Sequence, residues 1–405
     1  MSLAAPEQSP VADERTPFEP PPARRGLAIT VVAGAFGCIV VLAGLAFAFN
    51  RLAWPQTEPL GSPVMGINYS CDYAEYLLLE DPTRGLGWAE DDRPGRVQWC
   101  AGTFATLLRD TGAAHVRISV YWDEVEPREG EFDFALLDAL IETAAAHDAK
   151  VFLTVGIKAQ RHPEYYIPGW ALDDVHMPHG AVVTDDPLLR ERALRMVEAV
   201  LRHAAPSPVV EAWGADNEPF VPSQRASMWR LGRDFVQEEV GLVRALDPQQ
   251  RPVVITQAQH HLWDSYRRER EWILEDADVL GMSLYPFRNY SVLGVDMVVP
   301  IPELAPVHPN YAAHRKEAHE RGREYWITEL QAEPWADFDM HLISPGRPSP
   351  NLSPEKLRKS VEYARRTGAD RAYLWGAEWW LFQRERYGDA TWMDLGARLL
   401  AGEYD

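Results

Sequence analysis

The chain has 405 residues, 60 acidic and 40 basic, and its formal charge of −20 argues against a nucleic-acid binder, because such proteins concentrate basic side chains on one surface. An apolar fraction of 46% excludes disorder of the whole chain, and three cysteines exclude a disulfide-rich scaffold or a four-cysteine zinc module. The 15 Trp, 15 Tyr and 13 Phe exceed the needs of a core, so we expect some to line a binding surface.

The first 63 residues are predicted to lie outside the folded domain. Residues 1–25 are rich in proline and poor in large apolar side chains, which predicts a disordered tail. Residues 26–50 follow Arg24 and Arg25 and carry no charge, and a helix of this length reaches across a hydrocarbon core of about 30 Å. The excess of arginine before this span predicts a cytoplasmic N-terminus and an outward-facing C-terminal domain. Residues 51–63 form a proline-punctuated linker.

A cleaved signal peptide is the alternative interpretation of the apolar segment. Ala46-Phe47-Ala48 has the small-x-small form that a signal peptidase accepts. The apolar run is nevertheless longer than the roughly 7–15 residues of such peptides, which favours an uncleaved anchor.

From residue 64 onward, short apolar runs rich in β-branched residues alternate with amphipathic segments. The eight predicted strands are Val64–Tyr69, His115–Val120, Val151–Val155, Val209–Gly214, Val253–Thr256, Val279–Tyr285, Tyr325–Leu330 and Ala372–Trp375. Helix signals lie between them. Asp186 precedes Pro187 as an N-cap, and Ser353-Pro354 opens a segment that stops at Gly368.

This alternation predicts an α/β fold with a parallel sheet, and eight units in residues 64–405 fit one (β/α)8 TIM barrel. An open, doubly wound sheet is the alternative. It is less favoured because no glycine-rich phosphate loop follows the first strand. In the barrel, functional residues are expected at the C-terminal ends of the strands.

Two carboxylates end predicted strands. Glu218 follows the fourth strand in Asp216-Asn217-Glu218-Pro219, and Glu329 ends the seventh in Ile327-Thr328-Glu329. Both side chains can therefore lean over the same mouth, where one carboxyl would protonate a leaving oxygen and the other would attack an anomeric carbon or activate water. Two alternatives compete with this interpretation. In one, Glu218 is a capping residue. In the other, Glu333, four residues later, takes the role given to Glu329.

With these motifs the sequence resembles the clan of retaining (β/α)8 glycoside hydrolases that includes cellulases, β-mannanases and β-galactosidases. The resemblance covers about residues 64–395 and implies that Glu218 is the acid/base, preceded by Asn217, and that Glu329 is the nucleophile. Ser283 stands where the cellulase-type family has histidine, and Asp216 where an aromatic is common. The particular family is therefore not assigned.

The resemblance also implies three supporting residues. Arg117 in Val116-Arg117-Ile118-Ser119 would support the nucleophile, and Tyr285 would hydrogen-bond it. Trp375 in Leu374-Trp375-Gly376 would form the floor of the sugar subsite and would be joined to Gly376 by a cis peptide bond.

Further aromatics follow strand ends or lie in long loops. Sugar rings present apolar faces that pack on flat side chains, so we expect Trp122, Trp335 and Trp379 to bind substrate, with core packing as the alternative. The histidines complete no four-ligand spacing, and no metal site is predicted. Cys71 and Cys100 are candidates for a disulfide in an oxidising compartment.

The combined expectation is a membrane-anchored, extracytoplasmic retaining β-glycosidase that acts on oligo- or polysaccharides and needs no cofactor. A transglycosylase with the same two carboxylates is the nearest alternative. A carbohydrate-binding barrel without turnover is the alternative from another class.

Overall fold

A computed structural model describes residues 36–45, 59–79, 92–259, 266–292, 295–300, 310–335 and 339–404. The predicted tail 1–25 lies outside these ranges, as do most of the predicted membrane span 26–50 and the first part of the linker 51–63.

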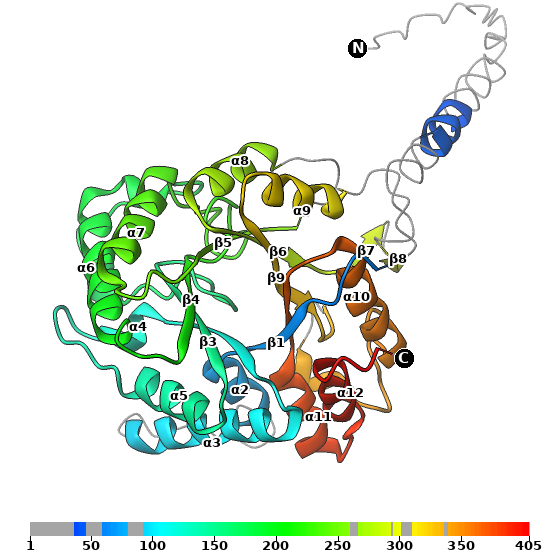
Figure 1. The fold of residues 1–405 in the computed structure, drawn as a ribbon, viewed down its shortest axis with the longest axis horizontal. Helices are drawn as coiled ribbons and strands as arrows, with labels where there is room; N and C mark the ends of the chain where they lie inside the picture. Colours follow the sequence, from blue (N-terminus) through cyan, green and yellow to red (C-terminus); the bar gives the residue numbers. More distant parts are fainter. Residues whose placement is uncertain are drawn as a thin grey trace, which may run out of the picture.

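Eight parallel strands close into a barrel in the order β1-β10-β9-β6-β5-β4-β3-β2 (Figure 1). Their bounds are β1 Val64–Tyr69, β2 His115–Ser119, β3 Lys150–Val155, β4 Val210–Ala215, β5 Val253–Gln257, β6 Val279–Leu284, β9 Glu324–Gln331 and β10 Arg371–Trp375. Each of the eight predicted strands is present, with bounds that differ by at most one residue at either end. The predicted (β/α)8 barrel is therefore confirmed.

Helices surround the ring of strands (Figure 1). They are α2 Cys71–Leu78, α3 Arg93–Thr111, α4 Trp122–Val125, α5 Ala135–Ala146, α6 Pro187–Ala204, α7 Arg233–Leu246, α8 Arg267–Asp276, α9 Tyr311–Glu320, α10 Pro354–Thr367, α11 Ala377–Tyr387 and α12 Thr391–Leu400. Short 3-10 turns occupy Gly169–Leu172, Val183–Asp185 and Met340–Leu342.

The two predicted helix boundaries are confirmed. The Asp186 carboxylate accepts hydrogen bonds from the backbone N–H groups of Leu188 and Leu189, which have no partner inside α6. The Ser353 hydroxyl caps α10 in the same way, and Gly368 ends that helix with a φ of 73°, a left-handed conformation that glycine adopts without a steric penalty.

The barrel interior is a packed core. Side chains from six neighbouring strands fill it, namely Phe152, Ala212, Val254, Val279, Trp326 and Tyr373. Gly281 on β6 makes room for these layers, because a Cβ there would lie 3.0 Å from the Cα of Thr256 and from the Thr328 side chain. A second apolar layer joins the outside of the strands to the helices.

One pair of strands was not predicted. β7 Phe287–Val292 and β8 Val295–Pro300, which follow β6 and precede α9 in the chain, form an antiparallel two-stranded sheet. It is separate from the barrel sheet, so the strand-then-helix alternation used for the prediction gives no signal for it.

Residues 36–45, inside the predicted membrane span, are helical, and their large apolar side chains are exposed. Within the described ranges, no helix is both long and apolar enough to cross a membrane.

A disulfide joins Cys71 at the start of α2 to Cys100 in α3, with Cα atoms 5.5 Å apart, as predicted. With Glu75, these cysteines form the one group of possible metal ligands found in the described part of the chain. Their sulfurs are bonded to each other, so the thiolates that a metal needs are not available.

Candidate active site

Glu218 and Glu329 lie at the same end of the barrel. Glu218 follows β4 and Glu329 is near the end of β9, and the ring order places β5 and β6 between these two strands. Because the carboxyl ends of parallel strands meet at one rim, the two side chains share the barrel mouth.

A buried hydrogen-bond network holds Glu329. The Arg117 guanidinium donates to its Oε1 across 3.0 Å, and the Tyr285 hydroxyl donates to its Oε2 across 2.7 Å. Arg117 also donates to the Asn217 Oδ1 across 2.7 Å. Four residues that the sequence singled out separately are thus joined in one network, and a charge-assisted bond fixes the Glu329 carboxylate.

Glu218 has a different environment. The Ser283 hydroxyl donates to its Oε1 across 2.5 Å, and Ser283 on β6 is in register with Glu329 on β9. Desolvation, followed by the negative charge of Glu329, raises the pKa of Glu218 to about 7, against the opposing charge of Lys158. With this pKa, Glu218 can still carry a proton near neutral pH, as a general acid must.

Sequence reasoning missed the role of Ser283. The residue was noted only because histidine is usual at its position in a related family. Its hydroxyl reaches Glu218 across the mouth, 65 residues away in sequence, and no local pattern around a serine in an apolar strand signals such a partner.

Glu333, the rival of Glu329, has a different partner. Its carboxylate accepts from the Arg161 guanidinium, which also donates to the Glu378 Oε2 across 2.9 Å. The guanidinium carbon of Arg161 lies 3.7 Å from the Tyr73 ring centroid and 3.8 Å from that of Trp375. Glu333 therefore belongs to a buried ion-pair cluster beside the mouth, whereas Glu329 has the Arg117–Tyr285 environment expected for the nucleophile.

Trp375 ends β10 as predicted, but Arg161 stacks on one face of its indole. Within the described ranges, the one cis peptide bond joins His162 to Pro163. The bond from Trp375 to Gly376 is therefore trans, and the expectation of a cis bond there is wrong.

The other three tryptophans differ in exposure. Trp122 is 1% exposed and donates its indole N–H to Glu126, and Trp379 is 2% exposed and packs edge-on against Trp392. The expectation that Trp122 and Trp379 stack on sugar is therefore corrected, because both rings are buried among the helices.

Trp335, which follows β9 in the chain, is the exception, because 39% of its surface is exposed. Its ring packs edge-on against Tyr285 with centroids 4.6 Å apart, and Tyr285 in turn contacts Glu329. An exposed indole beside the mouth can pack on the apolar face of a sugar ring.

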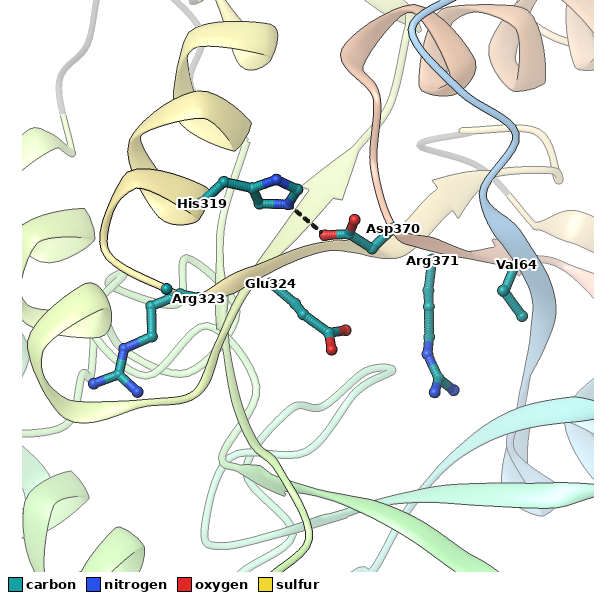
Figure 2. Close-up of a pocket in the computed structure, with 7 residues that line it drawn as sticks. Val64, His319, Arg323, Glu324, Asp370 and Arg371 are labelled. Atoms are coloured by element: carbon teal, nitrogen blue, oxygen red, sulfur yellow. Dashed lines mark hydrogen bonds and ion pairs between the residues drawn. The ribbon is translucent and has the colours of Figure 1, made fainter.

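A depression lies at the opposite end of the barrel. Figure 2 shows its lining, where Val64, Glu324 and Arg371 begin three strands and His319 pairs with Asp370 across 2.8 Å. The lining charges are engaged with one another or with neighbours, such as Arg371 with Glu211 at 2.7 Å. In such barrels this end serves stability, so we do not assign chemistry to it.

Comparison with known proteins agrees with this geometry. Residues 103–251 match the family model of glycoside hydrolase 42, described as β-galactosidase. A β-galactosidase of Halorubrum lacusprofundi is 30% identical over 126 residues, which are 27% of this chain and 17% of that protein.

Two solved structures share the fold. A cold-adapted β-galactosidase from Rahnella sp. R3 superposes with a TM-score of 0.56 and 13% identity, over 85% of this chain and 57% of that one. An exo-β-1,4-mannosidase from Opitutaceae bacterium strain TAV5 superposes with a TM-score of 0.52 and 18% identity, over 85% of this chain and 60% of that one. The chain thus spans less than two thirds of each of these relatives. The predicted resemblance to the (β/α)8 glycoside hydrolase clan is confirmed, and these relatives are β-glycosidases.

Proposed function

We propose that the chain is a glycoside hydrolase that cleaves β-glycosidic bonds with retention of configuration. The observation that carries the proposal is the contrast between two carboxyls at one barrel mouth. Arg117 and Tyr285 bind the Glu329 carboxylate, while the pKa of Glu218 is raised to about 7 by desolvation and by the charge of Glu329. Retaining glycosidases need such a pair, one anionic nucleophile and one proton donor.

In the first step, a Glu329 oxygen forms a bond to the anomeric carbon while the bond from that carbon to the leaving oxygen breaks. Glu218 donates its proton to this oxygen, so that the aglycone departs as a neutral alcohol. The hydrogen bonds from Arg117 and Tyr285 hold Glu329 in place for the attack.

In the second step, the Glu218 carboxylate takes a proton from water, whose oxygen attacks the anomeric carbon and displaces Glu329. Two displacements at one carbon restore the β configuration. The cycle closes with Glu218 protonated and Glu329 anionic, and one water molecule has been consumed.

β-Galactosides are the first substrates to assay, because the matching family model and the Halorubrum relative carry that name. β-Mannosides come second, after the name of the Opitutaceae structure. The loops that shape the sugar subsites differ between such enzymes, so the sugar has to be found by screening aryl β-glycosides and cell-wall oligosaccharides.

Proton NMR of the first product formed from the best aryl β-glycoside tests the mechanism. We expect the β anomer to appear first and the α anomer to grow later by mutarotation. Initial release of the α anomer would contradict retention. A glycosyl acceptor added to the same reaction distinguishes the alternatives, since a transglycosylase would favour the coupled product over hydrolysis.

We also propose that residues 26–50 anchor the protein in the membrane with the barrel outside. The uncharged run and the arginines before it support this, and the Cys71–Cys100 disulfide suits an oxidising compartment. After expression of the full chain, we expect it to stay in the membrane fraction through alkaline carbonate washing and to be digested by protease added outside. Release by carbonate would contradict the anchor.

A further inference from the structure

Lys158 is a buried cation beside the candidate acid/base. It lies in the loop after β3, and its side chain is 1% exposed. Its ammonium group donates to two backbone carbonyls of the segment that carries Glu218, to the oxygen of Glu218 itself across 2.8 Å and to that of Val221 across 3.2 Å.

The backbone of Lys158 forms hydrogen bonds to the same segment. Its N–H donates to the Asp216 Oδ1 across 2.6 Å, and its carbonyl accepts from the N–H of Asn217 across 2.6 Å. One residue thus contributes four hydrogen bonds to residues 216–221.

This segment needs support. Asp216 has a φ of 57° and Glu218 a φ of 49°, in the left-handed region that non-glycine residues seldom adopt. Such conformations are unfavourable for non-glycine residues and persist only where surrounding contacts enforce them. The contacts from Lys158 meet this need at the point where Glu218 leaves the strand.

The ammonium group also acts on the Glu218 carboxyl by its charge. The groups that face Glu218 come from several elements: Glu329 of β9, Ser283 of β6, Tyr285 after β6, Tyr266 before α8, and Lys158 and Glu164 of the loop after β3. Glu164 pairs with Lys158 at 3.4 Å and so offsets part of its charge. Behind the segment, Asp216 contacts buried Glu239 of α7.

We infer that Lys158 is a positioning residue for the acid/base carboxyl. It locks the 216–221 segment in its left-handed turn, and its charge sets the pH above which Glu218 no longer acts as an acid. This inference rests on the proposed function of Glu218.

The test compares Lys158→Met with Lys158→Arg through the pH profile of kcat/KM on an aryl β-glycoside. A positive charge favours the ionised carboxyl, so its removal should let Glu218 hold its proton to higher pH. We expect the basic limb of Lys158→Met to move up by about one pH unit, and that of Lys158→Arg to stay in place. Lys150→Met is the matched control, since Lys150 is exposed at the opposite end of β3.

Glu164→Gln gives a second arm that does not require Lys158→Met to fold. Removal of this negative charge should move the basic limb to lower pH, the opposite direction. A uniform loss of activity with an unmoved limb in Lys158→Met, or an unmoved limb in Glu164→Gln, would overturn the electrostatic role.

The inference can also be tested without turnover. Infrared difference titration of each variant against the same variant carrying Glu218→Gln isolates the protonation of Glu218. We expect the Lys158→Met midpoint to lie above the wild-type midpoint by the same amount as the kinetic limb. A shifted midpoint in a protein without glycosidase activity would refute the proposed function and leave the Lys158–Glu218 coupling intact.

Discussion

Replacing Glu329 by Gln should abolish turnover of every substrate, with a loss of kcat of at least about 10⁴-fold. An amide cannot form the bond to the anomeric carbon, and neither the leaving group nor the pH can compensate for that. The amide oxygen can still accept a hydrogen bond from Arg117, and the amide NH2 can donate to the Tyr285 hydroxyl oxygen, so the fold around it should persist. Steady-state rates on aryl glycosides with good and poor leaving groups measure the effect.

Two variants control this experiment. Glu324→Gln makes the same change at the opposite end of β9 and should retain wild-type kcat. Glu333→Gln addresses the rival carboxylate, which is bound to Arg161. If Glu333→Gln lost all turnover while Glu329→Gln kept it, the two glutamates would have to exchange roles.

Replacing Glu218 by Ala should give a loss that depends on the substrate. A poor leaving group needs the proton from Glu218, so kcat/KM on an alkyl glycoside should fall by about 10²–10⁴-fold. Dinitrophenolate leaves without protonation, so the first step with a dinitrophenyl glycoside should be nearly unchanged. The pre-steady-state burst on that substrate should therefore remain, followed by slow release of the sugar.

Azide provides the control for the Glu218→Ala variant. As an anion, azide needs no base to deprotonate it and can displace Glu329 directly, so it should restore the second step and yield a β-glycosyl azide. Equal losses on both leaving groups, with no azide effect, would remove Glu218 from the acid/base role.

Below about pH 7, the same carboxyl should be protonated in the wild-type enzyme, because desolvation and the charge of Glu329 raise its pKa to about that value. A raised pKa means that the acid form survives to higher pH. Wild-type activity should therefore fall as the pH rises above about 7, because the deprotonated carboxyl, like the alanine of Glu218→Ala, cannot donate a proton.

The barrel could be predicted from the sequence because its signals are local. A run such as Val151–Val155 between polar segments specifies a buried parallel strand, and Asp186 with Pro187 specifies a helix start. Strand ends in such a barrel meet at one rim, so the position of Glu218 and Glu329 at strand ends was enough to bring them together.

Contacts between distant segments of the chain were beyond that reasoning. Ser283 reaches Glu218 across 65 residues of sequence, and Lys158 reaches it across 60. Arg161 binds Glu333 from 172 residues away and covers one face of Trp375. None of these residues carries a signal in its own neighbourhood, since each contact depends on how segments distant in the chain meet at the mouth.

The same limit explains the tryptophans. Burial is set by what packs against a ring, and Trp122 and Trp379 follow strand ends just as Trp335 does, yet only the ring of Trp335 remains exposed among these three. The sequence by itself determined the barrel and the pair of carboxyls, through hydrophobic periodicity and strand ends. Only the tertiary structure decided which side chains besides Arg117 and Tyr285 surround that pair, because Ser283 and Lys158 lie far from Glu218 in the chain.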